Sequence, residues 1–194
     1  MATKAKPFVK SADTSSQVSS SKAELERMLR RYGATGFAVQ QQFDDSQLPV
    51  AASVQFVVPD KAGDKARVPV SLPIEIRRVY DALYGRPMKN GAWVTPEQSG
   101  KSWGHYTRVH DVNGYDAKKL AQAERVAWRN LVLWIDAALS AASIGFQTIT
   151  EAFFAHVVVK LDNGNTARMS EVVESMQGQL PTGVRALLAA PAED

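Results

Sequence analysis

Cationic and aromatic side chains alternate along residues 86–115, where Glu97 and Asp111 are the only acidic residues. The cations and rings are Arg86, Lys89, Trp93, Lys101, Trp103, His105, Tyr106, Arg108 and His110. Proteins that bind single-stranded nucleic acid use this combination, because cations follow the phosphates and flat rings stack on the bases. The pattern therefore predicts a nucleic-acid-binding surface. Under the alternative interpretation, the rings only anchor this segment on the core.

The cationic surface is expected to continue onto the helix that follows this segment. Residues 121–142 are strongly apolar, and polar side chains recur among them at the spacing of one helical face. A helix this apolar must be covered by other elements, so we predict that it is the central helix, with Trp128 and Trp134 in the core. The cations expected to extend the surface along it are Lys118, Lys119, Arg125 and Arg129.

No catalytic residue, metal site or cofactor is predicted. The stretch Gly100-Lys101-Ser102 resembles the end of a phosphate-binding loop, but Thr95 stands where that loop requires glycine. His105, His110 and His156 do not have the spacing of a compact metal site, and the chain contains no cysteine that could complete one. The sequence therefore favours a binding protein over an enzyme.

Composition and charge favour a cytoplasmic protein with a polyanionic partner. The absence of cysteine fits a reducing compartment, and the N-terminal residues lack the apolar run of a secretory signal. Arg125, Arg129 and Asp136 make the long apolar stretch too polar for a membrane span. The net charge is +3, and basic residues are concentrated in residues 61–129. A basic region of this kind favours nucleic acid through counterion release.

The elements that would position this surface combine helices and strands. Residues 1–21 are basic and rich in serine, which predicts disorder, and Ser21 with Glu24 forms a capping box that begins a helix. Alternating segments at 37–43, 50–58 and 67–72 predict three strands of an antiparallel meander. Pro73 is expected to begin a second helix that ends at Gly85. Residues 86–115 show neither the helical nor the strand periodicity of apolar residues, and they are predicted to be an irregular insert.

Shorter elements are expected after the long helix. Thr148 and Glu151 form a second capping box, which begins a short helix that ends at His156. Segments 157–160 and 166–168 predict a small hairpin, and Ser170 is expected to cap a last helix. The predicted fold class is α+β: a small antiparallel three-stranded sheet packed on a long central helix, with additional short helices. Residues 22–194 are expected to form one domain.

The order of these elements is typical of two nucleic-acid-binding architectures. A helix, a three-stranded meander and a later long helix occur in this order in double-stranded-RNA-binding domains. The core of phage single-strand annealing proteins, which assemble into rings, has a related order of three strands and a helix. Both comparisons rest on topology alone.

Several stretches of the chain resemble a family of small uncharacterised proteins of tailed phages and prophages. They are RYGATGF at 31–37, WRNLVLWI at 128–135, IGFQTI at 144–149, EAFFAH at 151–156, the Asn163-Gly164 turn and GQLP at 178–181. The chain departs from this pattern at Ala141 and Ala142, where acidic residues are usual, and at 73–115, which is an enlarged insert. The resemblance implies a phage-encoded protein of the host cytoplasm, associated with DNA replication or recombination.

Two functions of different classes remain open. The first is non-enzymatic binding of nucleic acid, most plausibly single-stranded DNA, through residues 86–129, with assembly into a homo-oligomer left open. The alternative is a protein-binding accessory factor that modulates a host or phage enzyme. The apolar long helix and residues 184–190 favour this alternative, because an exposed apolar patch marks a protein partner.

Overall fold

A computed structural model describes residues 9–61, 65–89, 92–93, 107–109 and 115–176 of the chain. Its elements, in chain order, are α1 (Val18–Tyr32), β1 (Gly36–Phe43), β2 (Pro49–Pro59), β3 (Arg67–Ile74), α2 (Ile76–Tyr84), β4 (Arg86–Lys89), β5 (Ala92–Trp93), β6 (Thr107–Val109), α4 (Ala117–Ser143), α5 (Ile149–Ala152), η1 (Phe154–His156), β7 (Val158–Lys160), β8 (Thr166–Arg168) and α6 (Met169–Met176). The predicted α+β fold class is confirmed.

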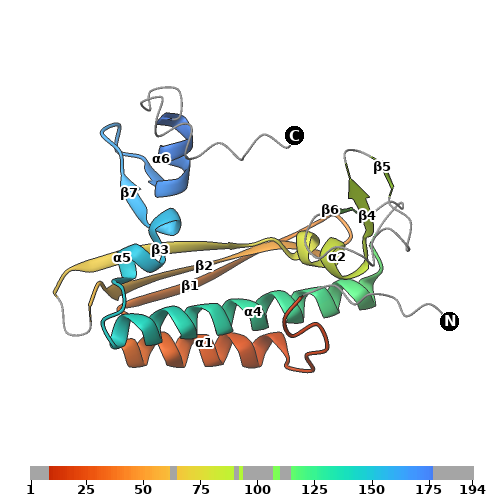
Figure 1. Cartoon of the computed structure of the whole chain (residues 1–194), viewed down its shortest axis with the longest axis horizontal. Helices are drawn as coiled ribbons and strands as arrows, with labels where there is room; N and C mark the ends of the chain where they lie inside the picture. Colours follow the sequence, from red (N-terminus) through yellow and green to blue (C-terminus); the bar gives the residue numbers. More distant parts are fainter. Residues whose placement is uncertain (1–8, 62–64, 90–91, 94–106, 110–114, 177–194) are drawn as a thin grey trace.

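The main sheet is an antiparallel meander in the order β1-β2-β3, as predicted. The helices α1 and α4 lie side by side on one of its faces (Figure 1). Alternate residues of the strands, such as Val54, Phe56 and Leu72, are buried against these helices. Many side chains of the opposite face are small or polar and uncharged, such as Gln40, Gln55 and Ser71, and β7, β8 and α6 lie on that side (Figure 1). The core therefore occupies the layer between the sheet and the two long helices.

The long helix α4 is the central helix, as the apolar stretch predicted. It spans 27 residues, which corresponds to a length of about 40 Å. Trp128 is fully buried in the core, but Trp134 is 42% exposed, so its assignment to the core was wrong. Trp134 packs edge-on against Phe153 and His156, at centroid distances of 5.3 and 5.8 Å, and part of the ring stays exposed. Six residues separate the two tryptophans, so their indoles project from different faces of α4.

The first helix begins at Val18, so the capping box predicted at Ser21 was wrong. Gln17 occupies the N-cap, and Ser21 is buried inside the helix. The preceding residues, predicted to be disordered up to residue 21, are held where the structure describes them: the Gln122 amide donates to the carbonyl oxygens of Ala12 and Thr14. Contact with α4 thus orders a serine-rich stretch whose own composition opposes helix formation.

Two expectations for residues 73–115 were also wrong. Pro73 does not begin α2 but lies in β3, opposite Ser53, where an edge strand tolerates a proline. The described part of 86–115 is not irregular, because β4, β5 and β6 form a second antiparallel sheet. These strands have two to four residues each, which is too short for periodicity to reveal them.

The C-terminal elements follow the sequence more closely. Thr148 and Glu151 form the predicted capping box, and β7 and β8 form the predicted hairpin. The helix expected to end at His156 divides into α5 and η1. The last helix begins at Met169, before the predicted cap at Ser170, and the Glu171 carboxylate accepts the Arg168 N–H there.

Candidate nucleic-acid interface

The structure brings together part of the predicted nucleic-acid-binding surface in the second sheet. Arg86 and Lys89 belong to β4, Trp93 to β5 and Arg108 to β6, and the strand order is β5-β4-β6. Lys101, Trp103 and Tyr106 lie outside the described residues.

The strand register places the predicted residues of this sheet close together. Met88, at the centre, pairs with Trp93 on one side and with Thr107 on the other, and Arg108 pairs with Pro87. The strand β6 also packs beside α2, close to the N-terminal end of α4 (Figure 1). The described strands of this stretch therefore lie together at one end of the molecule (Figure 1).

The four predicted cations of α4 have different surroundings. Lys118 and Lys119 are exposed in the first turn, and the Lys119 ammonium lies 5.7 Å from the centroid of the Tyr84 ring. Arg125 is half-buried and donates two hydrogen bonds to Gln122 Oε1, at 3.0 and 2.5 Å. One η nitrogen of Arg129 lies 2.6 Å from a carboxylate oxygen of Glu24 on α1. Of the four cations, only the two lysines are exposed.

A hollow of about 550 Å³ opens between the N-terminal segment, α2 and α4. Its lining residues are Val9, Ser11, Ala12, Asp13, Thr14, Leu83, Tyr84 and Arg129. Tyr84, 39% exposed, presents a ring to this hollow, and sequence reasoning missed it. Its position at the end of α2, directly before Gly85 and the cation Arg86, is the signal that could have identified it.

The electrostatics of this end are mixed. Burial raises the pKa of the Tyr84 hydroxyl, and Tyr80 adds to this effect while Arg125 opposes it, so the hydroxyl stays neutral at physiological pH. Asp116 caps α4, and the hydrogen bond from the Lys119 backbone N–H lowers the pKa of its carboxyl group. The lining of the hollow thus combines a neutral ring with one cation, Arg129, and one acid, Asp13.

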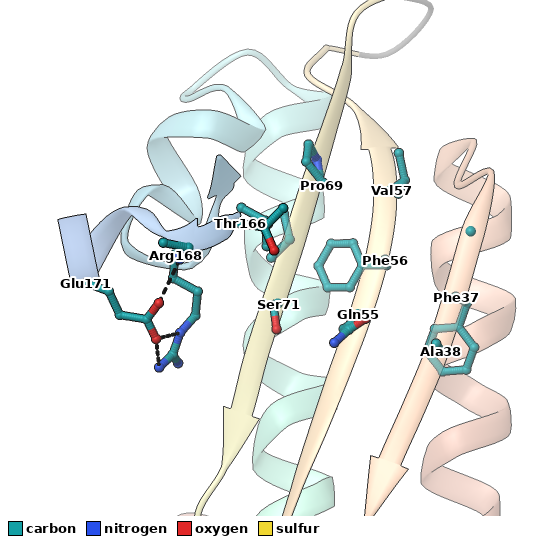
Figure 2. Close-up of a pocket in the computed structure, with 14 residues that line it drawn as sticks. Phe37, Ala38, Gln55, Phe56, Val57, Pro69, Ser71, Thr166, Arg168 and Glu171 are labelled. Carbon is teal, nitrogen blue, oxygen red and sulfur yellow. Dashed lines mark hydrogen bonds and ion pairs between the residues drawn. The ribbon is translucent and has the colours of Figure 1, made fainter. Parts of the chain in front are cut away.

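The opposite face of the main sheet offers a different environment. Figure 2 shows a second hollow, of about 510 Å³, between this face and the segment that contains Thr166, Arg168 and Glu171. Gln55 and Ser71 lie on its floor, and the Arg168 guanidinium is paired with Glu171 at 2.7 Å (Figure 2). Because its described cation is already paired, this hollow is less suited to a polyanion than the end that carries Lys118 and Lys119.

The three histidines of the chain were candidates for a metal site, and one of them, His156, lies among the described residues. Within the residues that the structure describes, no three His, Asp or Glu side chains lie together where they could hold a metal ion. His156 packs on Trp134, and burial lowers its pKa, with Arg168 adding to this effect. Among the described helices, none is both long and apolar enough to cross a membrane.

Comparison of the chain with protein-family models, curated proteins and solved structures gives no match. The resemblance to tailed-phage proteins, and the setting that it implies, therefore stay a prediction. The site consists of an exposed tyrosine ring and two exposed lysines at the N-terminal end of α4, with Arg125 and Arg129 further along the same helix.

Proposed function

We propose that this protein binds nucleic acid without enzymatic activity and holds single-stranded DNA at the N-terminal end of α4. The observation that carries the proposal is the position of Tyr84, whose exposed ring lies 5.7 Å from the Lys119 ammonium and lines one hollow with Arg129. A flat ring beside cations suits a base and its neighbouring phosphates. The proposed setting is DNA replication or recombination of a phage in the host cytoplasm.

The residues at the N-terminal end of α4 would have different roles in binding. Tyr84 would stack on a base, and Lys118 and Lys119 would contact phosphates at a helix N-terminus, whose dipole also favours anions. Arg125 and Arg129 are already bonded to Gln122 and Glu24, so they would contribute less than the sequence alone predicts. The second sheet would extend the path of the bound DNA strand, because β4 begins two residues after Tyr84.

A salt titration tests this proposal. Binding of a fluorescent single-stranded oligonucleotide is measured by anisotropy at several salt concentrations. Each lost phosphate contact lowers the slope of log affinity against log salt by about 0.7 for a single strand. The double variant Lys118→Gln with Lys119→Gln should therefore lower the slope by about 1.4 and weaken binding at low salt.

A matched control keeps this test specific. The double variant Lys61→Gln with Lys65→Gln removes the same charge from exposed positions in the β2–β3 connection, at the other end of the molecule (Figure 1). This control should bind almost as tightly as the native chain. The proposal is wrong if the native chain does not bind the oligonucleotide at low salt, or if both double variants lose the same affinity.

A second candidate function, docking of a protein partner, is favoured by a different observation. Four large apolar side chains within residues 134–154 are exposed: Trp134, Ile144, Phe146 and Phe154. Phe146 is 82% exposed, although burying a side chain of this size is worth about 2 kcal/mol. An accessory factor that uses this region would bind one protein, and the double variant Ile144→Ser with Phe146→Ser would abolish that binding. Under this second function, the affinity of the native chain for DNA would be weak and would not depend on Lys118 and Lys119.

A further inference from the structure

The strand β1 forms one edge of the main sheet. Figure 2 shows it as the outermost strand, with β2 on one side only. The other edge strand, β3, is contacted by the C-terminal hairpin through a bridge between Val70 and Val157. Within the described part of the chain, no strand lies beside the outer edge of β1. Its outward backbone N–H and C=O groups are therefore available for pairing.

The sequence of β1 lacks the features that usually prevent edge pairing. Its eight residues, GFAVQQQF, include no charge and no proline. The strand β3 has both, with Arg67 at its start and prolines at positions 69 and 73. Natural sheets protect their edges with charges, prolines or covering elements, because an unprotected edge pairs with another strand. Of the two edge strands of this sheet, β1 is therefore the one whose sequence does not oppose pairing with another strand.

Two side-chain hydrogen bonds also attach β1 to the helices α1 and α4. Gln41 accepts a hydrogen bond from the Lys22 ammonium of α1 and donates one to the Glu124 carboxylate of α4, both at 2.9 Å. Fixing the strand in advance lowers the ordering cost of pairing. The helix α1 lies on one face of the sheet (Figure 1), so it does not pair with the outer edge of β1.

We propose that β1 pairs antiparallel with β1 of a second copy of this chain, which joins two three-stranded sheets into one of six strands. A two-fold axis brings identical strands together in antiparallel orientation. A strand that pairs with its own copy brings two identical net charges together, so a strand free of charge suits this pairing best. The neutrality of β1 therefore favours a second copy over a partner chosen by charge.

One register agrees best with the exposed side chains. With the axis at Gln40, Phe37 lies opposite Phe43 of the second copy and Gln40 lies opposite its own equivalent. Phe43 is 53% exposed, and a cross-strand aromatic pair would cover it.

Because the chain has no cysteine, a single introduced thiol gives an unambiguous test. Gln40→Cys places two thiols opposite each other, at a Cβ separation of about 5 Å, and should form a covalent dimer on oxidation or with a short bifunctional thiol reagent. Gln55→Cys is the control, since Gln55 is exposed on the same face but belongs to the central strand β2. It should stay monomeric on a denaturing gel.

Sedimentation of the unmodified protein provides the second measurement. The native chain should sediment as a dimer that dissociates on dilution, and Gln40→Lys should shift it to the monomer by placing like charges opposite each other. Gln55→Lys, with the same change one strand away, should leave the dimer intact. A native monomer at every concentration overturns the proposal, and so does a dimer that Gln40→Lys does not weaken. Neither measurement requires DNA, so failure here is independent of the proposed nucleic-acid binding.

Discussion

Arg129 of α4 and Glu24 of α1 form an ion pair with an N–O distance of 2.6 Å. The two side chains are 27% and 41% exposed, so solvent screens the pair, and its contribution to stability is at most about 1 kcal/mol. Its larger effect concerns binding, because the carboxylate neutralises a guanidinium that lines the hollow beside Tyr84. Glu24 therefore limits the affinity of the proposed site for polyanions.

Replacing Glu24 should strengthen nucleic-acid binding. In Glu24→Gln, Arg129 loses its carboxylate partner and can contact a phosphate, so the salt slope should become steeper by up to about 0.7. The measurement is the anisotropy titration described above. Glu26→Gln is the control, because it removes the same charge from the same helix at a residue that pairs with Arg30. Equal gains in both variants would mean that net charge alone, and not the hollow, determines affinity.

Tyr84 should contribute through its ring. Tyr84→Ala should weaken single-strand binding by about 1–3 kcal/mol, which is roughly 5-fold to 150-fold. Tyr84→Phe keeps the ring and should bind almost as tightly as the native chain. The measurement is the same titration at one low salt concentration. If Tyr84→Phe loses as much affinity as Tyr84→Ala, the hydroxyl is the important group and base stacking is the wrong explanation.

Two neighbouring phenylalanines should have very different effects on stability. Phe153 is 1% exposed and packs edge-on against both Phe56 and Trp134, at centroid distances of 5.7 and 5.3 Å. Phe153→Ala should lower the free energy of unfolding by roughly 3–5 kcal/mol, measured by urea denaturation. Phe154 is 50% exposed, so Phe154→Ala should change the free energy of unfolding by about 0.5 kcal/mol or less. Similar losses in both variants would contradict the described packing.

His156 should make the fold less stable as the pH falls. Burial lowers the pKa of its ring in the folded chain, and its buried Nδ1 has no hydrogen-bond partner among the described residues. The unfolded chain therefore takes up this proton first, at pH values near 6.5, and stability falls as the pH decreases further. The measurement is urea denaturation between about pH 7.5 and 5.5.

The variant His156→Gln separates this effect from other acid-dependent changes. Backbone N–H groups lower the pKa values of Asp116 and Glu171 in the fold, so the stability that these carboxylates contribute is lost only at more acidic pH. The pH dependence in the range above should therefore become weaker in His156→Gln. An unchanged pH dependence would exclude His156 as its source.

Most elements of the fold could be predicted because their signals are local. The alternation in 50–58 and the apolar stripe of 121–142 each extend over several repeats, and the capping box of Thr148 and Glu151 is complete within four residues. Gly33, at a φ of 99°, ends α1 where the sequence indicated. In each case the residues that determine the structure are neighbours along the chain.

The errors occurred where distant residues decide the structure. Ser21 has the pattern of a helix cap, but it is buried in α1, and the residues before that helix are held by Gln122 of α4. Trp134 has the periodicity of the core, yet the elements around it leave much of the ring exposed. Tyr84 gave no periodic signal of its own, and only the packing of α2 on α4 brings it beside Lys119.

The sequence by itself determined the α+β class, the meander and the central helix, because periodicity and turn residues act over a few positions. It also determined which residue types could serve a polyanion. Only the tertiary structure decided which of them remain available: Lys118 and Lys119 are exposed, while Glu24 of α1 pairs with Arg129 of α4. Pairing between side chains depends on how helices far apart in the chain pack together, and no local pattern encodes that packing.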